Sequence, residues 1–138
     1  MFSLSKRTEY GLSALTYLSS LHDGQIANAA QIANNLVLPK ELLSKIMSEL
    51  VKAGLANSFA GPSGGFQLAR NAANVSLADI IIALENKPAL IECASDEDIC
   101  GKFSSCRIRL PMQRVNVQME NIFKETTLSD FVAERYKI

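Results

Sequence analysis

The sequence predicts a mainly α-helical fold with one small β-hairpin, an α+β class, followed by a long C-terminal helix. Three observations predict this fold. Apolar residues recur at helical spacing through residues 5–54. Two short extended runs then flank a glycine-rich turn. In the last third of the chain, apolar residues alternate at intervals of four and three. With 138 residues and 48% hydrophobic content, the chain can form one domain with a proper core.

The first three helices are predicted from their ends as well as from their periodicity. A helix is expected over residues 5–21, where turn residues follow. Asn28 is the predicted N-cap of a second, short helix. Pro39 is expected to be the first residue of a third helix, because its fixed backbone angle suits that position. Gly54 is expected to end this third helix.

The hairpin is predicted from residues 55–59 and 65–69, which flank Gly-Pro-Ser-Gly-Gly at 61–65. Three helices followed by such a hairpin predict a winged helix-turn-helix. Capping boxes, in which Ser or Thr is followed three residues later by Asp, predict further helices that begin at Ser76 and Thr127.

We therefore expect three parts in the chain. Residues 1–86 form the winged helix-turn-helix, residues 87–106 form a loop that carries the cysteines, and residues 107–138 form a dimerisation helix with a short C-terminal helix.

The exposed face of the third helix is a candidate nucleic-acid surface. It carries groups that can reach phosphates or base edges in a major groove, and these are Pro39, Lys40, Glu41, Ser44, Lys45 and Ser48. The alternative is an ordinary solvated helix face. Charge does not decide between them: the net charge is +0, and residues 1–75 carry six basic and four acidic side chains.

The three cysteines of the chain, Cys93, Cys100 and Cys106, fall within fourteen residues. An odd number of thiols cannot form a complete set of disulfides, and soft thiolates suit iron. The spacing therefore predicts an iron–sulfur site that needs a fourth ligand from elsewhere, for which Glu9, His22, solvent or a small thiol are candidates. Zinc is the closest alternative, although these spacings are wider than those of paired zinc thiols. Another alternative is that the three cysteines are buried or idle and bind no metal.

A five-residue apolar seam in the long helix is expected to form a dimer interface. Its members are Ile108, Met112, Val115, Met119 and Ile122. The alternative is packing against the chain's own core, but a chain of this length offers little for so long a stripe to cover. A two-fold dimer would place two recognition helices about 34 Å apart, one turn of a duplex.

Several segments together resemble the IscR- and NsrR-like iron–sulfur winged-helix regulators. The matching segments are residues 4–15, 50–55, 61–69 and 75–81, followed by the cysteine triplet and a long helix. The resemblance implies a cytoplasmic, homodimeric transcription regulator that binds a palindromic DNA operator and holds a 2Fe–2S or 4Fe–4S cluster. It also implies that Glu9 of the partner subunit is a candidate fourth ligand.

This chain departs from the family pattern at two positions. Ala60 stands where many relatives have an arginine before the Gly-Pro of the wing, which shifts the expected base contacts towards the third helix. Arg109 stands where some relatives have a histidine ligand, so the fourth ligand must be a different group.

The expected function is a DNA-binding repressor that senses cluster, redox or nitric oxide status. Phosphate contacts are expected from Lys6, Arg7, Lys40 and Lys45, base-edge contacts from Glu41 and Ser44, and wing contacts from Ser63, Gly64 and Gly65. A zinc-binding or cluster-free thiol sensor is the alternative regulator.

An enzyme, such as a small redox carrier, is disfavoured. The chain has a single histidine and lacks a nucleophile–base pair or cofactor motif. No apolar run is long enough to span a bilayer, and residues 1–7 do not have the character of a signal peptide, so we expect a cytoplasmic protein without a membrane partner.

Overall fold

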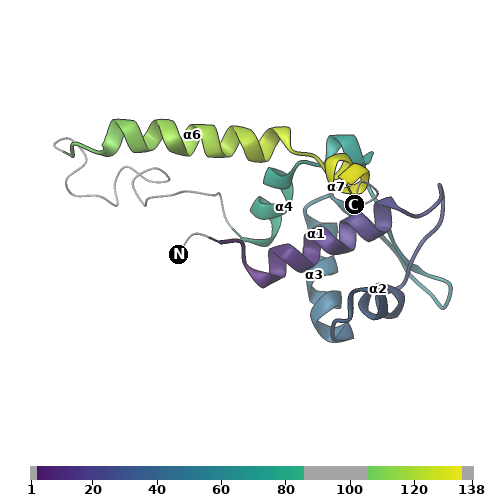
Figure 1. Ribbon diagram of the computed structural model, residues 1–138. Helices are drawn as coiled ribbons and strands as arrows, with labels where there is room; N and C mark the ends of the chain where they lie inside the picture. The colour runs from purple at the N-terminus through teal and green to yellow at the C-terminus, as the bar shows by residue number, and fades with distance from the viewer. Residues whose placement is uncertain (1–2, 86–105, 135–138) are drawn as a thin grey trace.

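The structure is a computed structural model that describes residues 3–85 and 106–134 (Figure 1). Its elements are α1 (Lys6–Ser19), α2 (Ala29–Leu36), α3 (Lys40–Lys52), β1 (Ala56–Phe59), β2 (Gly65–Leu68), the 3₁₀ helix η1 (Ala72–Asn74), α4 (Leu77–Leu84), α6 (Arg109–Glu125) and α7 (Leu128–Glu134). This order confirms the predicted α+β class, with a winged helix-turn-helix and a long C-terminal helix. Cys93 and Cys100 lie outside the described residues.

The predicted helix ends are largely confirmed. The Asn28 side chain accepts a hydrogen bond from the backbone N–H of Gln31, whose own side chain returns one to the Asn28 N–H. Ser76 and Asp79 form the same reciprocal pair at α4. Pro39 is the N-cap of α3 rather than its first helical residue, because its ψ of 135° is extended and the helix begins at the next residue.

The described winged helix-turn-helix, residues 3–85, forms the head of the molecule, and its hairpin is held against its helices by the segment between α1 and α2. β1 and β2 pair antiparallel, with Ala56 opposite Leu68 and Phe59 opposite Gly65. Ala27 forms a bridge to Phe66, whose N–H donates to the Ala27 carbonyl at 2.7 Å. A Cβ at Gly65 would lie 2.6 Å from the Ala27 backbone, so only glycine allows this close approach.

The core lies between α1, α2, α3, α4 and α7. Its larger buried side chains are Leu15, Ile32, Leu43, Ile46, Met47, Leu50, Leu55, Val75, Ile80 and Leu128. Gly11 allows α1 to approach α4 closely, since a Cβ there would meet the Leu84 side chain at 2.3 Å. Burial of one such leucine or isoleucine contributes roughly 1.5–3 kcal/mol.

The C-terminal helix belongs to the same core. Leu128 of α7 is fully buried, and its N–H donates to the Val75 carbonyl at 2.8 Å. The N–H of Leu77 in turn donates to the Thr126 carbonyl at 2.8 Å. This packing shows that α7 shares the core of the head. The predicted domain boundaries at residues 86 and 106 stay a prediction.

Helix α6 runs along one side of the molecule (Figure 1). Part of it packs against α4, and its N-terminal half extends beyond the head on the side opposite the hairpin. None of the helices in the described part of the chain combines the length and apolar character that a bilayer-spanning helix requires.

Candidate nucleic-acid interface and metal ligands

Helix α3 separates its side chains cleanly into two faces. One face is fully buried, and its residues are Leu43, Ile46, Met47 and Leu50. The predicted contact residues Lys40, Glu41, Lys45 and Ser48 are exposed, whereas Ser44 is half-buried. The exposed face therefore offers two ammonium groups, a carboxylate and hydroxyls, the groups that bind phosphates and base edges.

A groove of about 330 Å³ separates the wing from the first turns of α2 and α3. It brings together three of the predicted residues, Lys40, Gly64 and Gly65. It also contains Asn28 and Phe59, which the sequence indicated only as a helix cap and a strand residue. Among the described residues that line this groove, Lys40 alone carries a charge, so the groove favours an anion.

Arg7 lies on the surface of the head and is held there by two contacts. The Arg7 side chain stays 44% exposed, and its guanidinium forms an ion pair with Glu49 of α3 and donates a hydrogen bond to the Leu84 carbonyl of α4 at 3.4 Å. Arg7 therefore links the start of α1 to α3 and to the end of α4. Its predicted phosphate contact stays a prediction.

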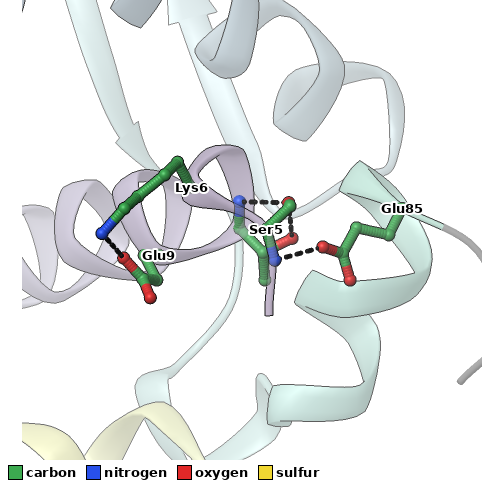
Figure 2. Close-up of polar contacts among 5 residues, drawn as sticks. Ser5, Lys6, Glu9 and Glu85 are labelled. Carbon is green, nitrogen blue, oxygen red and sulfur yellow. Dashed lines mark hydrogen bonds and ion pairs between the residues drawn. The ribbon is translucent and has the colours of Figure 1, made fainter. Parts of the chain in front are cut away.

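Lys6 and Glu9 form an exposed ion pair on the first turn of α1. The Lys6 Nζ and Glu9 Oε2 atoms are 3.1 Å apart, and the side chains are 76% and 47% exposed. The hydrogen bond and the charge of Glu9 raise the pKa of Lys6. Figure 2 shows this pair turned away from Glu85. The Glu9 carboxylate is thus accessible from outside the head, as a ligand donated to another subunit must be.

Glu85 ties the end of α4 to the start of α1. Its Oε1 accepts a hydrogen bond from the Ser5 N–H at 2.6 Å, and the Ser5 side chain accepts from the Thr8 N–H at 3.2 Å (Figure 2). Partial burial disfavours the Glu85 carboxylate, but hydrogen bonds from Ser5 and Thr8 outweigh that effect and lower its pKa. The predicted cysteine loop begins two residues after this contact.

The candidate metal ligands are described only in part. Cys106 is a free, half-buried cysteine three residues before α6 begins, while Cys93 and Cys100 lie outside the described residues. His22 is exposed in the turn after α1, at the opposite end of that helix from Glu9. Because α1 is about 20 Å long, one site cannot use both Glu9 and His22 of the same chain.

The predicted seam of α6 is exposed along one edge. Ile108, Val115 and Ile122 are 58%, 44% and 60% exposed, while Met112 and Met119 are half-buried. The helix also packs on α4 and carries one buried residue, Asn116, so the alternative of packing on the chain's own core applies to part of its surface.

A second exposed stripe on α6 was not predicted. Leu110 and Val117 are 56% and 53% exposed and line a shallow hollow with Arg114. Their spacing of seven residues in the sequence is the signal that could have indicated them.

Comparison with known proteins gives a consistent result. The sequence profile of the Rrf2 family, described as iron-dependent transcriptional regulators, matches residues 4–134. The structure of CymR, the global cysteine regulator of B. subtilis, is 26% identical with a TM-score of 0.79 and covers 97% of this chain and 98% of that one.

Two further structures are similar over nearly their whole length. The oxidized form of Staphylococcus aureus CymR is 25% identical with a TM-score of 0.72, over 95% of this chain and 96% of that one. IscR of T. potens is 23% identical with a TM-score of 0.72, over 99% and 90%, and this likeness concerns the fold.

Proposed function

The chain belongs to the Rrf2 family of transcriptional regulators and is therefore a DNA-binding regulator, and we propose that it is a repressor that senses iron–sulfur, redox or nitrosative status through a cluster. The observation that carries the proposal is the combination of three cysteines within fourteen residues and an exposed acid, Glu9, on the first turn of α1.

DNA binding is assigned to the exposed face of α3 and to the groove beside it. Lys40 and Lys45 contact phosphates, and Glu41 and Ser44 lie towards base edges in the major groove. Support for this assignment comes from the exposure of Lys40, Glu41 and Lys45 and from the positive charge of the groove. A dimer through α6 would present two such faces to a palindromic operator.

The residues that would hold the cluster are Cys93, Cys100 and Cys106 of one subunit and Glu9 of the other. Two described groups fit this assignment: the Cys106 thiol is free of any disulfide, and the Glu9 carboxylate is accessible to a second chain. When bound, a cluster would supply iron that can react with oxidants and nitric oxide. A carboxylate is a harder ligand than a thiolate, so Glu9 would hold an iron of the cluster less firmly than the cysteines would.

The signal passes to α3 through the start of α1. When Glu9 is a ligand, its ion pair with Lys6 is lost and the first turn of α1 is held from outside the head. The same turn contains Arg7, which contacts α3 through Glu49. It also contains Thr8, whose N–H donates to the Ser5 side chain beside Glu85. The state with Glu9 as a ligand and the state with Glu9 paired to Lys6 would therefore favour different placements of α1 relative to α3. The change is a shift between two populations of the same fold.

The test compares one protein sample in two states. Protein purified without oxygen is assayed on a duplex recovered by selection from a random-sequence pool, before and after the cluster is removed. We expect affinity to change by about tenfold or more between the states, a coupling of roughly 1.4 kcal/mol. Equal affinity and equal specificity in both states would contradict the switch.

The role of Glu9 has its own measurement. Glu9→Ala should alter the visible and circular-dichroism spectrum of the cluster, while Asp23→Ala, which removes an exposed acid beyond the far end of α1, should leave it unchanged. Identical spectra for wild type and Glu9→Ala would remove Glu9 from the ligand set.

A thiol sensor without a cluster, or with zinc, is the second candidate. It is favoured by the 26% identity to a regulator described as a global cysteine regulator and by the similarity to a CymR structure in an oxidized form. Analysis of iron, sulfide and zinc in protein purified without oxygen separates the two candidates.

A further inference from the structure

The wing of this protein carries no charge. From Ala53 to Ala69 the sequence contains no Lys, Arg, Asp or Glu. Within the described hairpin, Phe59 is the one large apolar residue that is exposed, at 46%. It stands at the last position of β1, opposite Gly65, which has no side chain to cover it. A single exposed apolar side chain is common on protein surfaces, so the position of Phe59, more than its exposure, decides what the ring can contact.

The position of Phe59 indicates what kind of partner the ring can contact. The ring forms one wall of the groove whose other wall contains Lys40 and the first turn of α2. Lys40 is also the first residue of α3, so the groove is continuous with the candidate nucleic-acid face of that helix. The groove thus has a cationic wall and an apolar wall that face the same space.

A nucleotide of a DNA strand has this same pair of properties. Its phosphate is anionic and suits Lys40 together with the positive end of α2. Its deoxyribose and base edges are apolar enough to pack on an aromatic ring, and apolar side chains are common contacts in the minor groove. Since the groove contains no acidic side chain among its described lining residues, nothing there repels the phosphate.

We infer that Phe59 is a DNA-contacting residue of the wing, which packs on the deoxyribose and base edges of the minor groove next to the major groove that α3 enters. This inference rests on the proposed DNA-binding function and adds a residue and a mode of contact to it. The wing then responds to the shape and width of the minor groove through an apolar contact, without a positive charge at its tip.

The salt dependence of binding distinguishes an apolar contact from a phosphate contact. Phe59→Ala should weaken binding to the selected duplex by about five- to tenfold without changing the slope of log K against log salt, because no counterion is released at that contact. Lys40→Ala should weaken binding and reduce the slope by about 0.9, as expected for one lost phosphate contact. Asn57→Ala, at an exposed position on the same strand, is the matched control and should bind as wild type.

A second variant gives a direct signal of contact. The chain contains no tryptophan, so Phe59→Trp introduces a single tryptophan at the wing, whose emission can be excited apart from that of the three tyrosines. We expect its emission to be quenched or shifted when the selected duplex is added, while a tryptophan at exposed Asn74 in η1 should respond little. A spectral change that depends on protein concentration without DNA would identify a second copy of the chain as the occupant and overturn the inference.

The outcomes for the two proposals are distinguishable. If wild type binds the duplex specifically while Phe59→Ala binds equally well and Phe59→Trp gives no signal, the inference about Phe59 is wrong and the proposed function stands. If wild type selects no duplex above non-specific binding, the proposed function fails first.

Discussion

Val37 occupies the turn between α2 and α3 in a left-handed conformation, with φ 57° and ψ 52°. Among the described residues it is the one non-glycine residue with positive φ. A β-branched side chain is strained there, and at 88% exposed the valine gains almost no burial in return. The conformation persists because the Leu38 N–H donates to the Ala33 carbonyl at 2.9 Å and closes the end of α2.

Replacement of this residue should stabilise the protein. We expect Val37→Gly to raise the free energy of unfolding by about 0.5–1 kcal/mol, because glycine adopts the left-handed conformation without strain and little packing is lost. The midpoint of thermal unfolding should rise by roughly 2–4 °C. Val117→Gly, at an exposed position inside α6, should have the opposite sign. A lower midpoint for Val37→Gly would show that the valine makes a stabilising contact.

Residues of this kind mark the limit of prediction from sequence. Asn28 and Ser76 were predicted as caps because their bonds reach only three residues along the chain. No local pattern predicts a left-handed valine, because that conformation depends on how α2 and α3 pack. The exposure of Phe59 and its place beside Lys40 also depend on contacts between distant segments.

At the scale of elements, the end of α4 is joined to the start of α1 by a few polar contacts. Glu85 accepts from the Ser5 N–H, and Arg7 donates to the Leu84 carbonyl. These contacts lie directly before the segment that contains Cys93 and Cys100. They are the described route by which a change in that segment would reach α1.

The contribution of Glu85 to the stability of the folded protein should depend on pH. Its folded-state pKa is lowered, so its stabilising effect is fully present above the unfolded value of about 4.3 and is lost as pH falls through the lower, folded value. Glu85→Gln should therefore be less stable than wild type near pH 7, and the difference should narrow as the pH falls below about 4. Thermal unfolding of both proteins across this range measures the effect. A constant difference at every pH would mean that the carboxylate charge plays no part.

The capping boxes predicted where α4 and α7 begin, but not where they pack. The Asp130 carboxylate accepts from the Thr127 N–H at 2.8 Å, as the sequence suggested. That capping pattern does not predict that Leu128 is buried where α7 contacts α1 and η1. The apolar stripes of α6 are a further case, because two of them are exposed and sequence alone favoured one.

At the scale of the whole molecule, the two stripes of α6 make opposite predictions about the dimer. If the predicted seam is the interface, Ile122→Asp should convert a dimer to a monomer, because a buried unpaired carboxylate is strongly unfavourable. Val117→Asp, on the other stripe, should leave the dimer intact. Light scattering at a series of concentrations measures both. A monomeric Val117→Asp beside a dimeric Ile122→Asp would assign the interface to the second stripe.

The same pair of variants connects assembly to DNA. A monomer presents one α3 to the duplex, so Ile122→Asp should lose much of the affinity that two linked heads provide. The predicted contact residues of α3 would be unchanged in that variant, which separates the loss of assembly from the loss of contacts.

The buried position of Leu128 also has a consequence for biosynthesis. The side chain completes a core that otherwise comes from residues 14–84, yet it is made after the whole of α6. During translation the head would keep apolar surface exposed until residue 128 has left the ribosome. By then the whole of α6 has been synthesised and can pair with a neighbouring chain. Completion of the head and pairing of two chains would then occur in the same interval, so a defect in one would be expected to appear as a defect in the other.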